Sequence, residues 1–161
     1  MSGNPTMGPD LADQIDAWAQ ARLAELRAEA EAIAIEWEVE DRQLRKETGK
    51  PPGRLTVRIR DVGGRGTPGA FSIDWMHFWY LRTSDKRSLY RSAYIPRGHG
   101  VDRYPAGAFA GHIRAWQRAL VSATEDRFAA IRAEAREIAA VRTRYRQAEL
   151  RRARRQASGG A

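Results

Sequence analysis

The sequence contains no cysteine among its 161 residues. Disulfide bonds and thiolate zinc sites are therefore excluded, and a chain without cysteine suits a reducing compartment. No apolar run approaches the roughly 20 residues needed to cross a bilayer, and the start lacks the basic and then apolar pattern of a signal peptide. We therefore expect a cytoplasmic protein that does not enter a membrane.

Motifs for catalysis and metal binding are also lacking. The three histidines, His77, His99 and His112, have a spacing that matches no metal-binding motif. The stretch from Gly63 to Gly66 lacks the spacing and the strand-to-helix context of a phosphate-binding loop. No serine, histidine and aspartate occur in a recognisable nucleophile context. The sequence therefore predicts a protein that is not an enzyme and that holds neither a metal nor another cofactor.

Positive charge is abundant, and it is unevenly distributed. The chain has a net charge of +8, and 25 of its 28 basic residues are arginine. Residues 1–50 carry six basic and eleven acidic side chains, residues 51–104 carry ten and four, and residues 105–161 carry twelve and five. Because arginine favours forked contacts with phosphate or carboxylate, this acidic arm and basic remainder suit a polyanionic partner.

Residues 10–47 are predicted to form a long amphipathic helix. Asp10 is a plausible N-cap, and the segment from Thr48 to Gly53 carries the glycine and proline residues that end a helix. Apolar residues recur at helical spacing on one stripe, namely Leu11, Ile15, Trp18, Leu26, Ile33, Trp37 and Leu44. Ile35 and Val39 fall off this stripe, and we expect them to form a second apolar patch that faces another layer.

Three strands are expected after this helix. Residues 54–61 alternate between an apolar face and a face of arginine and threonine, which is typical of a half-buried strand. A second strand over 71–82 and a third over 87–95 are joined by a turn at 83–86. The three strands are predicted to form an antiparallel meander.

The remainder is predicted to form a loop from residue 96 and then a second long helix over about 105–155. The apolar stripe of this helix contains Phe109, Ile113, Trp116, Leu120, Ile131, Ile138 and Tyr145, with Phe128 beside it. Ser122 and Glu125 have the spacing of a capping box, which leaves open a break in the helix.

These elements predict an α+β fold with a long N-terminal helix, a three-stranded antiparallel β-meander, and a long C-terminal helix antiparallel to the first. An acidic and a basic helix can pair along an apolar seam as in a coiled coil, although the same seam could serve a homodimer. We expect a single domain over 10–155, flanked by disordered tails at 1–9 and 156–161.

The aromatic residues of the second strand divide between its two faces. Phe71, Ile73, Trp75, His77, Trp79 and Leu81 are predicted to face the core. Phe78 and Tyr80 fall on the other face, where we expect them beside Arg58 and Arg60 of the first strand and near Tyr90 or Arg91 of the third. Aromatic rings among arginines suit bases and phosphates, but they also suit cation-π pairs within the sheet or burial against a partner chain.

Candidate nucleic-acid-binding residues come from the sheet and from the loop that follows it. They are Arg54, Arg58, Arg60, Phe78, Tyr80, Arg82, Lys86, Arg87, Arg91, Arg97, His99 and Arg103. A second basic cluster lies near the C-terminus, where seven arginines between positions 142 and 155 accompany one acid, Glu149. Such clusters release condensed counterions when they meet a phosphate backbone, although a solvated helix tip has the same composition.

Several short motifs together resemble one protein family. They are EW at Glu36 and Trp37, SIDW at Ser72 to Trp75, WY at Trp79 and Tyr80, YIPRGHG at Tyr94 to Gly100 followed by Tyr104, and EDRFAAIR at Glu125 to Arg132. Their order over roughly residues 20–145 resembles the MobI-type conjugative transfer proteins of integrative conjugative elements and related plasmids. The resemblance implies an auxiliary factor for DNA mobilisation that acts with a relaxase at the origin of transfer, and it carries over no catalytic residues.

Two hypotheses follow from these patterns. The first is a non-enzymatic DNA-binding accessory of conjugative transfer, with DNA at the origin of transfer and a relaxase or another transfer protein as its partners. The second is a helical dimerisation or adaptor module that binds a protein partner through the apolar stripes of its long helices.

Overall fold

The computed structural model describes residues 10–51, 53–62 and 68–158. Helix α1 spans Leu11–Thr48 and helix α2 spans Arg118–Ser158. The strands are β1 (Leu55–Asp61), β2 (Phe71–Arg82) and β3 (Ser88–Tyr94), and the short 3-10 helices η1 (Ala106–Phe109) and η2 (Ala115–Gln117) precede α2. The predicted α+β fold with its antiparallel meander is confirmed. The predicted tail at 1–9 lies outside the described residues, as does most of the glycine-rich loop before β2.

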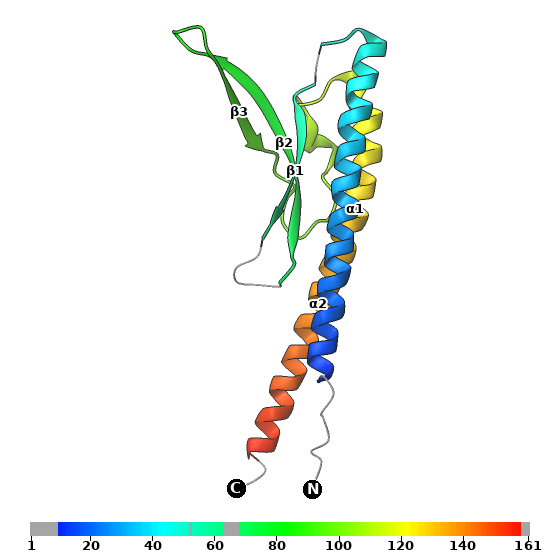
Figure 1. The fold of residues 1–161 in the computed structure, drawn as a ribbon, viewed down its shortest axis with the longest axis vertical. Coiled ribbons are helices and arrows are strands. Elements are labelled where there is room, and N and C mark those ends of the chain that lie inside the picture. Colours follow the sequence, from blue (N-terminus) through cyan, green and yellow to red (C-terminus); the bar gives the residue numbers. More distant parts are fainter. Residues whose placement is uncertain (1–9, 52, 63–67, 159–161) are drawn as a thin grey trace, which may run out of the picture.

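The two long helices lie side by side and antiparallel, and the sheet packs on one side of the pair (Figure 1). The strand order is β1-β2-β3. Because β1 pairs only with the part of β2 from Phe71 to His77, the last part of β2 and β3 project beyond it as a two-stranded ribbon (Figure 1). At the opposite end of the molecule, the last turns of α2 project past the start of α1 (Figure 1).

The core is organised around Trp75 of β2, whose side chain is fully buried. Its ring makes edge-on contacts with Trp37 of α1, Phe109 of η1 and Phe128 of α2, at centroid distances of 5.0, 5.7 and 5.9 Å. Aromatic pairs in this geometry contribute about 0.5–1.5 kcal/mol each beyond the area that they bury. One side chain therefore fixes the sheet to both long helices.

The predicted apolar stripe of α1 is correct in the middle of the helix and displaced at its start. Ile33 and Trp37 are buried, whereas Leu11 and Trp18 are 54% and 51% exposed. The sheet does not reach the first turns of α1 (Figure 1). Among the described residues, α1 faces α2 there, and Arg142 and Arg146 of α2 pair with Asp16. Ion pairs therefore contribute to the helix contact at this end.

The outer face of α1 differs from expectation. Ile35 and Val39 are 64% and 52% exposed. The expectation that another layer covers them is wrong, because the sheet packs on the opposite side of the helix, against Ile33 and Trp37.

The second long helix begins later than predicted. Residues 105–117 instead contain η1 and η2, separated by a turn in which Gly111 has a left-handed φ of 77° that an α-helix cannot include. The break considered at Ser122 and Glu125 does not occur, since α2 is continuous through both residues. The helix also continues to Ser158, past the predicted end at about residue 155.

Candidate nucleic-acid interface

The register of the sheet separates two features that were predicted to lie together. Arg58 and Arg60 lie on the end of β1 that pairs with the start of β2. Both guanidinium groups pair with the buried carboxylate of Asp74, at 3.8 and 3.2 Å. Phe78 and Tyr80 lie toward the other end of β2, beyond the start of β1. The expectation that these rings stand beside Arg58 and Arg60 is therefore wrong.

Phe78 and Tyr80 instead form an aromatic cluster with Tyr90 of β3. Tyr90 lies 5.8 Å from each of the other two rings, stacked on Phe78 and edge-on to Tyr80. Tyr80 and Tyr90 are paired across the ribbon, and they are 63% and 50% exposed. The expectation that Tyr90 lies near these two rings is confirmed, although Tyr90 was not among the candidate nucleic-acid-binding residues.

A groove lies between the aromatic cluster and the C-terminal half of α1. It comprises two hollows of about 330 and 440 Å³ that share Phe78, Tyr80 and Arg45 in their walls. In the first hollow, the wall on α1 includes the acidic residues Glu38 and Asp41. The first hollow therefore has mixed charge.

The second hollow of the groove is basic. Its charged lining residues are Arg45 of α1, Arg54 at the entry to β1, and Arg114 before η2. None of these three arginines forms an ion pair within the described part of the chain. The structure thus brings three predicted residues, Arg54, Phe78 and Tyr80, into one groove.

The ribbon carries most of the other predicted cations. Arg82, Lys86 and Arg91 are exposed, and none of them has an ion-pair partner among the described residues. Arg87 is also exposed and pairs with Asp85 at 3.4 Å. The projecting ribbon is therefore electropositive along much of its length.

The predicted residues of the loop after β3 are divided. Arg97 is partly buried, and its guanidinium lies over the Tyr104 ring at 5.7 Å. Arg103 pairs with Asp126 of α2. His99 is exposed between two glycines with left-handed φ. The two arginines are thus engaged within the protein, whereas His99 remains open to solvent.

The arginines near the C-terminus are of two kinds. Arg142 is buried and pairs with Asp16 of α1 at 2.8 Å, and Arg146 pairs with the same carboxylate at 2.5 Å. The others are exposed and form no ion pair among the described residues, namely Arg144, Arg151, Arg152, Arg154 and Arg155. The last four, here called the α2 tip, lie on the part of α2 that projects past α1 (Figure 1). The acidic helix therefore neutralises only part of the basic one.

Glu125, interpreted from the sequence as a capping residue, is a buried anchor. Its carboxylate accepts hydrogen bonds from Nε1 of Trp75 and from the backbone N–H of Tyr104, both at 2.8 Å. Arg132 pairs with it at 2.7 Å and also donates to the backbone carbonyl of Ile73. Burial raises the pKa of Tyr104 well above its usual range. The SIDW motif, Tyr104 and the EDRFAAIR motif thus meet in the core, where their hydrogen bonds hold the sheet on α2.

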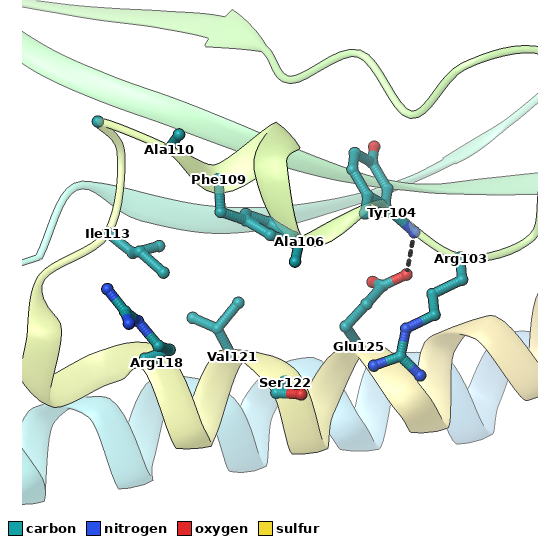
Figure 2. A pocket seen from close by; sticks show the side chains of 11 residues that line it. Arg103, Tyr104, Ala106, Phe109, Ala110, Ile113, Arg118, Val121, Ser122 and Glu125 are labelled. Atoms are coloured by element: carbon teal, nitrogen blue, oxygen red, sulfur yellow. Dashed lines mark hydrogen bonds between the residues drawn. The ribbon is translucent and has the colours of Figure 1, made fainter.

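A separate pocket of about 520 Å³ lies between η1 and α2 beside this anchor (Figure 2). Phe109, Ile113 and Val121 give it an apolar lining, with Arg118 at one end. Glu125 lies at the other end, where its carboxylate is occupied by the bond to Tyr104 drawn in Figure 2 and by the donors named above. The pocket is therefore mainly an apolar surface.

The described residues contain neither a metal-binding cluster nor a membrane-spanning helix. No three histidine, aspartate or glutamate side chains gather there in a group that could hold a metal ion. Neither long helix, over its described length, has an apolar stretch sufficient to cross a membrane.

A protein-family model described as MobI protein matches residues 26–146. The chain belongs to the MobI family. No curated protein matches it, and no solved structure matches it. The resemblance drawn from the short motifs is thereby confirmed.

Membership of the MobI family indicates an accessory role in conjugative mobilisation. The range matched by the MobI model contains the groove, the ribbon and the buried anchor at Glu125. The α2 tip lies beyond its end at residue 146. The groove therefore lies within the residues that match the MobI model, whereas the α2 tip lies outside them.

Proposed function

We propose that this MobI-family protein is a non-enzymatic DNA-binding accessory of conjugative transfer that acts in the cytoplasm, at the origin of transfer, together with a relaxase. The family supports the transfer role. The main support for DNA binding is that the exposed cations of the ribbon other than Arg87, and those of the α2 tip, lack carboxylate partners among the described residues, although α1 is rich in acids.

The physical basis is counterion release. Each phosphate that a lysine or arginine neutralises frees condensed cations from the DNA, so affinity falls steeply as salt rises. Arginine in addition offers forked hydrogen bonds that match phosphate oxygens. An exposed arginine that already has a carboxylate partner contributes less to the free energy of DNA binding, because it must give up that partner first.

The test is binding of the purified protein to duplex DNA that contains the element's own origin of transfer. We expect affinity to fall by about 10³-fold or more between about 50 and 200 mM salt, as for proteins that make six or more phosphate contacts. A footprint on the same DNA would locate the bound sequence. Absence of measurable binding at low salt would contradict the proposal.

A second function is favoured by the exposed outer face of α1. Ile35 and Val39 are more than half exposed there, and acidic residues flank them, among them Glu31, Glu36 and Glu38. In a homodimer through this face like charges would meet, so a basic amphipathic helix of another transfer protein is the better fit. The adaptor function predicts that Ile35→Glu with Val39→Glu abolishes binding to such a partner, whereas Val141→Glu on α2 does not.

Sedimentation and binding experiments with the element's relaxase would decide this second function. A protein that remains strictly monomeric and binds no purified transfer protein of the element would rule it out.

A further inference from the structure

The groove beside the ribbon combines two chemistries, aromatic rings and arginines without carboxylate partners among the described residues. One wall carries the rings of Phe78, Tyr80 and Tyr90, and the second hollow carries arginines from three separate segments. Arg45 and Arg54 are near each other in sequence, but the tyrosines and Arg114 are far from them, so only the folded chain assembles the groove.

The tyrosine rings of the groove are accessible. Tyr80 and Tyr90 are 63% and 50% exposed even though they contact each other and Phe78. Exposed aromatic rings on an open sheet can stack on nucleic acid bases whatever the sequence, since every base has a π-face. A purely structural role would leave less of both rings in solvent, because burial is what makes aromatic side chains stabilising.

The charges divide the groove into two parts. Glu38 and Asp41 line the first hollow and oppose phosphate there, and Asp41 accepts a hydrogen bond from Gln117 at 2.6 Å. Arg54 and Arg114 line only the second hollow. A nucleic acid strand in this groove would therefore place its phosphates in the second hollow and its bases against the tyrosines.

We propose that the groove binds an unpaired stretch of single-stranded DNA, with bases on Tyr80 and Tyr90 and phosphates at Arg45, Arg54 and Arg114. This inference rests on the proposed DNA-binding function and specifies the substrate class. In a duplex the faces of the bases are stacked on one another and only their edges are open, so the tyrosine rings find a partner only where strands are separated. The α2 tip offers charge alone and meets phosphates of either form.

The test compares one oligodeoxynucleotide, fluorescein-labelled and taken from the transfer-origin region, as a single strand and as a duplex. Fluorescence anisotropy at fixed low salt gives both affinities. Tyr80→Leu with Tyr90→Leu keeps apolar bulk on the ribbon but removes the rings, and Tyr80→Phe with Tyr90→Phe is the matched control that keeps them. We expect the leucine variant to lose about 10-fold or more in single-strand affinity, with duplex affinity nearly unchanged and the phenylalanine variant near wild type on both.

Equal losses on single strand and duplex, or no loss on the single strand, would overturn the groove assignment and leave the DNA-binding function standing. Failure of the wild type to bind either form at low salt would overturn both. Should the leucine variant fail to fold, wild-type protein can be photocrosslinked to the same single strand carrying 5-iododeoxyuridine. Adducts on the peptides containing Tyr80 or Tyr90 are expected, and adducts confined to the α2 tip would contradict the proposal.

Discussion

Glu125 and Arg132 form the one ion pair in the described residues in which both side chains are almost fully buried, at 2% and 7% exposed. Burying two charges is costly unless hydrogen bonds satisfy what remains of both groups. Here Trp75 and Tyr104 supply donors to the carboxylate, and backbone carbonyls accept from the guanidinium. The pair therefore fixes the sheet, the loop after β3 and α2 in place relative to one another.

Replacing Glu125 with Gln is expected to lower the free energy of unfolding by about 3–5 kcal/mol, because it leaves the Arg132 guanidinium buried without a countercharge. Urea denaturation measures the change. Glu134→Gln is the matched control on the same helix, since Glu134 forms an exposed pair with Arg22 that is worth about 1 kcal/mol or less. Similar losses in the two variants would contradict the role given to the buried pair.

His77 makes the stability of the protein depend on pH. Burial, followed by the charges of His112 and Arg54, lowers the pKa of His77 below its ordinary value of 6.5. As pH falls through 6.5 the unfolded chain takes up a proton that the folded chain still excludes, so stability decreases toward acid pH.

We therefore expect His77→Phe, which preserves the stacking on Trp79, to reduce the loss of melting temperature between about pH 8 and about pH 5.5. Thermal unfolding followed by circular dichroism at several pH values measures this. The exposed His99, replaced by Gln, is the control. An unchanged pH dependence in the His77 variant would show that other groups are responsible.

At the scale of elements, the sheet has two dissimilar halves. In the half near Arg58 and Arg60, β1 pairs with β2, and Trp75 of β2 packs against both long helices. Asp74 is buried there beneath the two arginines. The ribbon has no β1 partner beyond Phe78 and its strand β3 is exposed along its length. The first half is built for stability, and the ribbon is free to meet a ligand.

Replacing Arg58 and Arg60 together with Ala is expected to destabilise the protein by about 1–3 kcal/mol, since it leaves the buried Asp74 carboxylate without a countercharge. Adding Asp74→Asn should recover most of that loss. Chemical denaturation of the double and triple variants tests the expectation. If the triple variant is no more stable than the double one, Asp74 is not the cause, and if it recovers, its DNA affinity reports the direct contribution of the two arginines.

At the scale of the whole molecule, the two long helices set the charge distribution. Asp16 and Glu36 of α1 pair with Arg142, Arg146 and Arg127 of α2. Because α2 extends past α1 (Figure 1), the arginines of its tip have no acidic neighbour on α1. Positive charge therefore accumulates at the two projecting parts of the molecule, the tip and the ribbon.

Replacing the four arginines of the α2 tip with Gln is expected to weaken DNA binding to a similar degree for every sequence. It should also reduce the slope of log affinity against log salt by up to about 0.9 for each lost phosphate contact. Melting temperature should change little, since the four side chains are exposed and unpaired. Arg22→Gln with Arg27→Gln is the control, because both arginines already have carboxylate partners, and an equal loss per charge there would argue against a specific role for the tip.

The sequence by itself determined the two long helices, the three strands and their order, but not the short helices η1 and η2. Helix α1 was predicted over 10–47 and spans Leu11–Thr48, and β2 has the predicted bounds of 71–82. These predictions succeeded because the periodicity of apolar residues that distinguishes helices from strands can be read from residues close together in sequence. The short motifs likewise sufficed to predict the MobI family. The single domain over residues 10–155 stays a prediction.

Only the tertiary structure decided which side chains meet. The partner of Arg58 and Arg60 depends on the register between β1 and β2, and the buried role of Glu125 depends on α2 facing Trp75. The groove likewise needs the end of α1, the entry to β1 and the segment before η2 to converge on Tyr80. These are contacts between distant parts of the chain, and local spacing carries no information about them, because register and packing are fixed by the fold as a whole.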